Sequence, residues 1–103
     1  VDYVFDTRFL NNPHWQEELR QLTGVDREVQ DFVHADIGFQ AFMGNVTQII
    51  ELVLPALQRT GRPQLGVSFG CTGGRHRSVT SAEYLSRWAK QKHIKHILEH
   101  LEL

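Results

Sequence analysis

The sequence predicts an α/β domain with a small, largely parallel three-stranded sheet and packed helices, in the order β-α-α-α-β-α-β. Two short runs, residues 1–5 and 65–69, have the β-branched and aromatic composition of strands. Apolar residues at helical spacing lie between these runs and after them. Parallel strands joined by helices place their carboxyl ends at one edge of the sheet, where α/β domains bind ligands.

Length and composition narrow the class further. A chain of 103 residues builds one hydrophobic core, so we expect a single domain over residues 1–103. No apolar run approaches the roughly 20 residues of a membrane-spanning helix, and no secretory leader is evident, so we expect a cytoplasmic protein without a membrane partner. The single cysteine, Cys71, excludes an internal disulfide and a cysteine-rich zinc site. We expect neither metal nor cofactor.

The first half of the chain reads as a strand followed by helices. Residues 6–12 form a polar loop after the first strand. Asn12 and Pro13 suit an N-cap and a first helical turn, and Gly24 would end that helix. Its inward face would consist of Trp15, Leu19 and Leu22. A second helix is predicted from Asp26.

The second half continues the alternation. Apolar residues three or four apart from Phe39 to Leu57 predict a long helix that Pro55 kinks or ends. After the second strand, a further helix should run from the glycine-rich loop to about residue 92. Residues 94–103 also suit a helix, but the βαβ pattern favours a return strand.

The segment from residue 65 to 79 is the most informative part of the chain. A strand ends at Gly70, two adjacent glycines follow at Gly73 and Gly74, and a helix with Arg77 and Ser78 in its first turn begins. Glycines allow positive φ and close approach to a ligand, while free amides, a helix N-terminus and arginine attract anions. The second half of the chain carries a net +5 against −6 for residues 1–58. These features favour a negatively charged ligand at the loop.

This loop departs from two known phosphate-binding motifs and matches a third. The Walker A pattern fails because Arg75 and His76 stand where glycine and lysine belong, and the dinucleotide fingerprint has the wrong glycine spacing. Cys71 and Arg77 match the C-x5-R-[ST] pattern of cysteine phosphatases, although Gly70 stands where those enzymes usually have histidine. Phosphatase activity is therefore an alternative to a binding domain that is not an enzyme.

A second cluster follows the first strand. If the two strands are neighbours, Asp6, Arg8 and Asn12 face the same crevice as the glycine-rich loop and suit a sugar phosphate. The competing interpretation is structural: Asn12 only caps a helix, Trp15 is core, and Asp6 pairs with Arg8 on the surface.

The C-terminal part offers another alternative. A basic patch for RNA backbone could consist of Arg87, Lys90, Lys92 and Lys95. A solvated helix surface explains the same residues equally well. Three histidines at positions 93, 96 and 100 share a helical face, but no acid-histidine pattern supports a metal site.

The chain resembles the C-terminal domain of the RNase adapter protein RapZ family, bacterial proteins described as P-loop nucleotide-binding proteins. The resemblance spans about residues 1–94. It rests on Asp6-Thr7-Arg8-Phe9-Leu10, Asn12-Pro13-His14-Trp15, Leu19-Arg20, Thr23-Gly24-Val25-Asp26 and Gly70-Cys71-Thr72-Gly73-Gly74-Arg75-His76-Arg77-Ser78-Val79.

The resemblance implies a regulatory domain of amino-sugar metabolism that binds glucosamine-6-phosphate or a related UDP-sugar. It also implies small RNA as a second ligand, with an N-terminal nucleotide-binding domain or a separate protein as partner. The implied sugar-phosphate site consists of Asp6, Arg8, Asn12, Thr72, Gly73, Gly74, His76, Arg77 and Ser78. Two departures matter. The family's N-terminal Walker A domain is absent, so we expect no ATP hydrolysis, and residues 97–103 are apolar and acidic where relatives have a basic tail.

Overall fold

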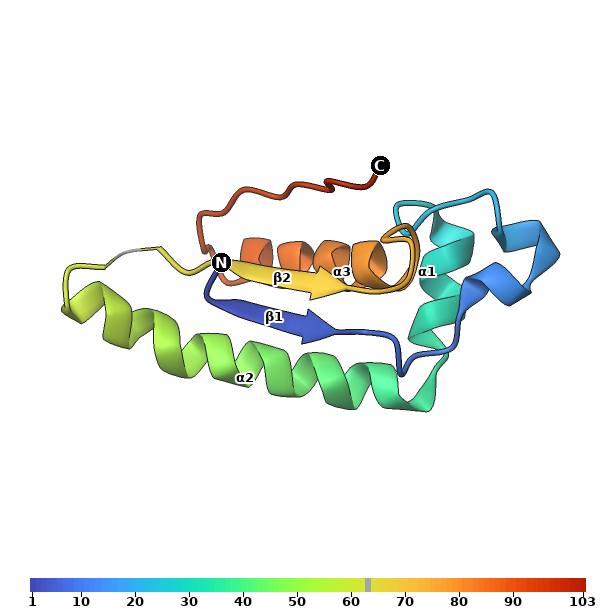
Figure 1. Cartoon of the computed structure of the whole chain (residues 1–103). Helices are drawn as coiled ribbons and strands as arrows, with labels where there is room; N and C mark the ends of the chain where they lie inside the picture. The colour runs from blue at the N-terminus through green and yellow to red at the C-terminus, as the bar shows by residue number, and fades with distance from the viewer. Residues whose placement is uncertain (63) are drawn as a thin grey trace.

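The computed structural model describes residues 1–62 and 64–103 and has an α/β arrangement. Two strands, β1 (Tyr3–Asp6) and β2 (Val67–Gly70), form a parallel sheet (Figure 1). Their register pairs Tyr3 with Val67 and Asp6 with Gly70, so the two carboxyl ends lie side by side. The predicted adjacency of the two loops is therefore confirmed.

Three α-helices accompany the sheet in the described part of the chain: α1 (Arg27–His34), α2 (Ile37–Arg59) and α3 (Arg77–Gln91). In Figure 1, α2 and α3 run beside the strands, and α1 lies beyond their carboxyl ends. The predicted helices from Asp26, through residues 39–57 and up to about residue 92 are confirmed within a few residues.

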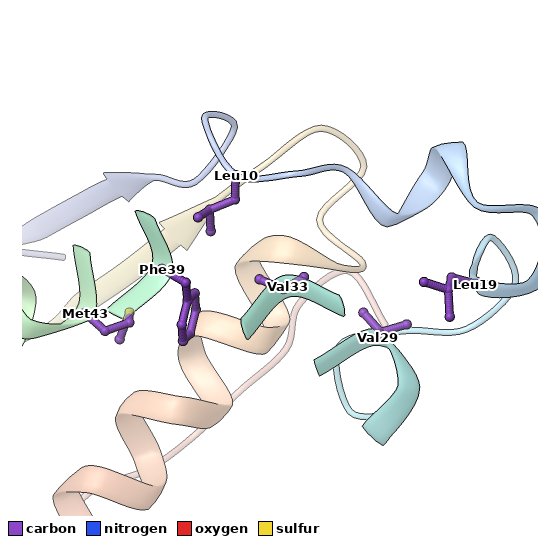
Figure 2. Packing of buried hydrophobic residues seen from close by; sticks show 6 residues of the cluster. All are labelled: Leu10, Leu19, Val29, Val33, Phe39 and Met43. Atoms are coloured by element: carbon purple, nitrogen blue, oxygen red, sulfur yellow. The ribbon is translucent and has the colours of Figure 1, made fainter. Parts of the chain in front are cut away.

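The core lies where α1, α2 and the segment after β1 meet. Its buried residues are Leu10, Leu19, Val29, Val33, Phe39 and Met43 (Figure 2). Aromatic rings extend this core to the sheet and to α3, since Phe42 packs edge-on against Phe69 and Tyr84 against Phe39. Each fully buried side chain of this size contributes about 1.5–3 kcal/mol. This packing holds the strand ends in place.

The prediction of a helix between Asn12 and Gly24 is wrong. Two 3-10 turns replace it, η1 (Pro13–Trp15) and η2 (Glu17–Leu19), and Gln16 between them has extended backbone angles. The Asn12 side chain caps η1 by accepting a hydrogen bond from the His14 amide at 3.0 Å. Trp15, assigned to the core in the structural interpretation, is 75% exposed. Without Trp15 facing inward, the segment lacks the continuous apolar face that sustains a helix.

The predicted third strand is absent from the described residues, so the sheet has two strands and not three. Residues 92–103 carry no strand and contact α3 through side chains. His96 Nε2 lies 2.7 Å from Ser86 Oγ, and His100 Nε2 lies 2.7 Å from Glu83 Oε2. The segment runs back along α3 (Figure 1). Contacts to a helix surface do not form a backbone ladder, so no strand results.

Helix α2 differs from prediction in two ways. It continues through Pro55 to Arg59, so the expectation that Pro55 ends its first part is wrong. Pro55 and Glu51 are both exposed, so water can reach the Glu51 carbonyl that proline leaves without a helical partner. By length and composition, α2 is also apolar enough to cross a membrane, although the sequence has no unbroken apolar run of that length. A core helix of a soluble protein passes the same test.

Candidate functional site

A hollow of about 370 Å³ lies at the carboxyl ends of the two strands. One wall comes from the end of β1 and the residues after it, and the other from the end of β2 and the start of the glycine-rich loop. The lining residues are Val4, Phe5, Asp6, Arg8, Gly70, Cys71 and Thr72. The crevice that the strand order predicted therefore exists, and it contains three of the predicted ligand residues: Asp6, Arg8 and Thr72.

Thr7 sets the distance between the two walls. Its backbone amide and its Oγ1 hydroxyl each donate to the Gly70 carbonyl at 2.8 Å. Thr7 is fully buried, so water does not compete for these bonds. The two loops thus leave the sheet as one rigid edge.

Asp6 and Arg8 form a bidentate pair on the first wall. Arg8 Nε donates to both carboxylate oxygens at 2.9 Å, and Nη2 donates to Oδ2 at 2.6 Å. These side-chain bonds, together with one from the Arg8 amide, lower the pKa of Asp6 to about 2. Both side chains are more than half exposed, so the pair presents charge to the hollow and to water.

Cys71 is the centre of the second wall. The Ser78 amide donates to Cys71 Sγ at 3.3 Å, and Sγ lies 3.2 Å from the Ser78 hydroxyl oxygen. Burial raises the pKa of the thiol. Hydrogen bonds from Ser78 and from the Gly74 and His76 amides lower it by more than burial raises it, so the pKa of Cys71 lies below its ordinary value. Amides from the loop and from the start of α3 therefore converge on this sulfur. Such a group of N–H donors favours negative charge.

The two loop glycines have the predicted backbone angles. Gly73 has φ of 79° and Gly74 has φ of 65°, in the left-handed region that suits glycine. A Cβ atom at Gly74 would lie 2.6 Å from Cγ of Glu102, so the C-terminal segment reaches this loop. A Cβ atom at Gly73 would meet nothing within 4 Å. The loop is therefore open at Gly73 and covered at Gly74.

The two arginines of the loop have opposite surroundings. Arg77 is 5% exposed, and its Nη1 donates to the Arg8 carbonyl at 2.6 Å and to the Leu10 carbonyl at 3.1 Å. It thereby ties the loop after β1 to the start of α3. Arg75, which the predicted site omits, is exposed beside the Gln21 carbonyl.

Three other predicted residues do not line the hollow. Asn12 is used as the cap of η1. His76 is 6% exposed, and burial lowers its pKa against the opposing effect of the Leu22 and Leu19 carbonyls. Ser78 is buried beneath Cys71. Asn12 thus belongs to the segment after β1, and the buried His76 and Ser78 hold the start of α3, so none of the three faces a ligand in the hollow.

A glycine that the predicted site omits fixes the loop from behind. The Gly24 amide donates to the Arg75 carbonyl at 2.7 Å. A Cβ atom there would lie 2.4 Å from the Thr80 amide nitrogen and 2.6 Å from the His76 carbonyl oxygen. Only glycine lets these backbones approach so closely. The motif Thr23-Gly24-Val25-Asp26 contains this signal, but a single sequence does not distinguish a close backbone approach at Gly24 from a helix stop.

The residues of the predicted RNA patch are all exposed. Arg87 and Lys90 lie on the last turns of α3, and Lys92 and Lys95 follow it. Among the described residues, no three histidine, cysteine or acidic side chains gather as a metal site.

Comparison with known proteins identifies the family of this chain. The sequence matches the family described as RapZ C-terminal domain over residues 1–103. The chain belongs to the RapZ C-terminal domain family. The resemblance that the sequence motifs indicated is thereby confirmed.

Relatives share the domain at high identity. A nucleotide-binding protein of Dinoroseobacter shibae is 52% identical over 84% of this chain and 29% of its own length. One of Paramagnetospirillum magneticum is 46% identical over the whole chain and 34% of its own length. One of Bacillus licheniformis is 44% identical over 94% of this chain and 33% of its own length. This chain spans about a third of these relatives, which carry further sequence outside the matched domain.

Proposed function

We propose that this RapZ C-terminal domain is a regulatory module that binds a phosphorylated amino sugar, of the glucosamine-6-phosphate or UDP-sugar type, in the strand-end hollow. The observation that carries the proposal is the convergence of loop amides on Cys71 Sγ at the edge of that hollow. A lowered thiol pKa reports surroundings that favour an anion. A phosphate group is an anion of higher charge that would benefit from the same positive helix end and from loop amides that do not donate to Cys71.

The polar groups of the hollow divide between the two ends of such a ligand. Phosphate would accept hydrogen bonds from the open part of the loop, where Thr72 and Gly73 are exposed. Arg8 would add positive charge from the opposite wall. Asp6, held as a carboxylate by its low pKa, would accept from sugar hydroxyls or from the amine. The buried Arg77 and Ser78 would hold the loop in shape.

Calorimetric titration tests this assignment. We expect glucosamine-6-phosphate to bind, and glucosamine without phosphate to bind at least tenfold more weakly, because phosphate contacts supply most of the affinity. Thr72→Val should weaken binding of the phosphorylated sugar about tenfold by removing one hydroxyl. Thr60→Val, at the far end of α2, is the matched control and should bind normally. Equal affinity for both sugars would refute the proposal.

RNA binding is the first alternative, supported by the exposure of the four basic residues named above. It predicts an affinity that falls steeply as salt rises, since phosphate contacts release counterions. A gel-shift series at several salt concentrations measures this. Substituting Lys90 and Lys92 together should then reduce the salt dependence of binding. Arg27, an exposed arginine at the start of α1 beyond the carboxyl ends of the strands, serves as a control.

Phosphatase activity is the second alternative, supported by the lowered pKa of Cys71. Such an enzyme needs its motif arginine on the substrate phosphate. Here Arg77 Nη1 bonds to two backbone carbonyls. The alternative predicts turnover of a generic phosphate ester that Cys71→Ser abolishes, and an inactive parent protein would exclude it.

A further inference from the structure

The last nine residues of α2 include a run of apolar side chains and no buried residue. The last buried residue of the helix is Ile50. Residues 51–59, which we call the α2 tip, are all intermediate or exposed, and Leu52 is 76% exposed. The tip projects past the ends of the strands in Figure 1. Its six consecutive apolar residues are Leu52, Val53, Leu54, Pro55, Ala56 and Leu57.

This pattern differs from that of a surface helix. From the first to the sixth, these residues advance about 500° around the helix axis at 100° per step, so apolar side chains point in every direction. A helix that is apolar all round is normally buried. Apolar surface left in water costs roughly 25 cal/mol per Å² compared with burial. A contiguous patch of this kind marks a contact surface.

The start of the described chain lies next to the α2 tip. The Asp2 carboxylate accepts hydrogen bonds from Arg62 and, at 2.8 Å, from the Gly66 amide. The Asp2 and Tyr3 amides donate to the Gly66 carbonyl at 2.9 and 3.0 Å. Arg62 follows α2 by three residues, so these bonds fasten the N-terminal residues to the segment that leaves the tip. A chain entering at Val1 therefore arrives at this end of the molecule.

A second hollow connects the entry point with that segment. It has a volume of about 360 Å³ and is lined by Val1, Asp2, Arg62, Gln64 and Gly66. It combines a charged pair with backbone polar groups, beside an apolar helix end. An apolar centre with a polar rim is the usual composition of a protein contact.

We propose that the α2 tip is the docking face for the nucleotide-binding domain that precedes this domain in the longer relatives. In those relatives, about two thirds of the sequence lies outside the matched part. The family is described as a C-terminal domain. Their remaining sequence therefore joins on the Val1 side, beside the tip. The partner surface would be an apolar face that packs around Leu52 and Leu57. This inference does not depend on the identity of the small ligand.

Hydrogen exchange tests the proposal in a chimera and in the isolated chain. In the chimera, this chain replaces the matching segment of the Paramagnetospirillum magneticum relative, whose match covers every residue. We expect the amides of residues 53–54 and 56–59 to exchange at least tenfold more slowly in the chimera, because docking suppresses the opening of the helix end. Equal rates in the two proteins would overturn the proposal.

Paired substitutions locate the contact. Leu52→Glu in the chimera should return exchange of the tip to the rate of the isolated chain. Ile37→Glu is the matched control, since Ile37 is 98% exposed at the opposite end of the same helix, and should leave the rate slow. Circular dichroism checks that both variants are folded. A dimer of the isolated chain that Leu52→Glu abolishes would instead assign the face to a second copy and would also overturn the proposal.

Discussion

Replacing Arg77 with methionine separates anchoring from direct phosphate contact. Arg77 is 5% exposed, and its Nη1 donates to the Arg8 and Leu10 carbonyls. Hydrogen bonds from a charged donor contribute about 1.5–3 kcal/mol each. Methionine fills much of the same space and removes the cost of burying a charge, which offsets part of this loss. We therefore expect the free energy of unfolding to fall by about 2–4 kcal/mol.

Urea denaturation followed by circular dichroism measures this loss. A domain of this size has a total stability of about 5–15 kcal/mol and a urea slope of about 1–3 kcal/mol per M. The unfolding midpoint should therefore move down by roughly 1–3 M. Residues 7–10 should also lose order, because both carbonyls lose their donor.

Arg75→Met is the control because Arg75 has the same charge, lies two residues away in the same loop and is exposed. Exposed substitutions of this kind normally change stability by less than about 0.5 kcal/mol. If Arg77→Met were as stable as Arg75→Met, the anchoring argument would be refuted. If Arg77→Met stayed stable but lost phosphate binding, the role taken from the motif alone would be the correct one.

Three further perturbations follow from the geometry of the site. Ser78→Ala should raise the pKa of Cys71, because a hydroxyl that stabilises the thiolate is lost, and the pH dependence of alkylation by iodoacetamide measures it. Arg8→Ala should raise the pKa of Asp6 from about 2 toward 3.8, as carboxyl chemical shifts would report. Because the folded pKa of Asp6 is depressed, any stability that Arg8 adds exists above about pH 4 and disappears as pH falls through about 2. Gly24→Ala should cost about 2 kcal/mol or more in the free energy of unfolding, since its Cβ would overlap two backbone atoms of the α3 start.

Each of these perturbations has an outcome that contradicts it. An unchanged alkylation profile would show that Ser78 does not stabilise the thiolate. An unchanged titration of Asp6 would mean that the pair with Arg8 does not persist in solution. For Gly24→Ala the control is Gly44→Ala, where a Cβ meets nothing within 4 Å and a helical glycine is replaced, so stability should rise by about 0.5–1 kcal/mol.

The elements with strong periodicity were predictable from sequence. That the loops after the two strands lie side by side followed from two strand-like runs joined by helices, whereas the register itself did not. The positive φ angles of Gly73 and Gly74 followed from the freedom of adjacent glycines. Helix α2 was predictable because its apolar residues repeat over more than five turns. These features depend on residues that are close together in the sequence, so they can be recognised from one sequence alone.

The failures concern tertiary context. In an ideal helix, Leu19 and Trp15 would share a face. In the structure Leu19 is buried and Trp15 is 75% exposed, because the chain turns at Gln16. The tail from residue 94 has enough apolar residues for a strand, but its histidines bond to α3. The orientation of Arg77 was likewise hidden, since a motif does not show whether a guanidinium points toward the ligand or toward backbone carbonyls.

The contact between Gly74 and Glu102 decides how glycine substitutions in the loop should be interpreted. An alanine at Gly74 would strain the backbone and push the end of the chain off the protein at the same time, so a change in ligand affinity there has two inseparable causes. Gly73 has the same left-handed backbone but open space around it. An alanine at Gly73 therefore alters loop geometry alone, and the difference between the two variants isolates what the terminal segment contributes.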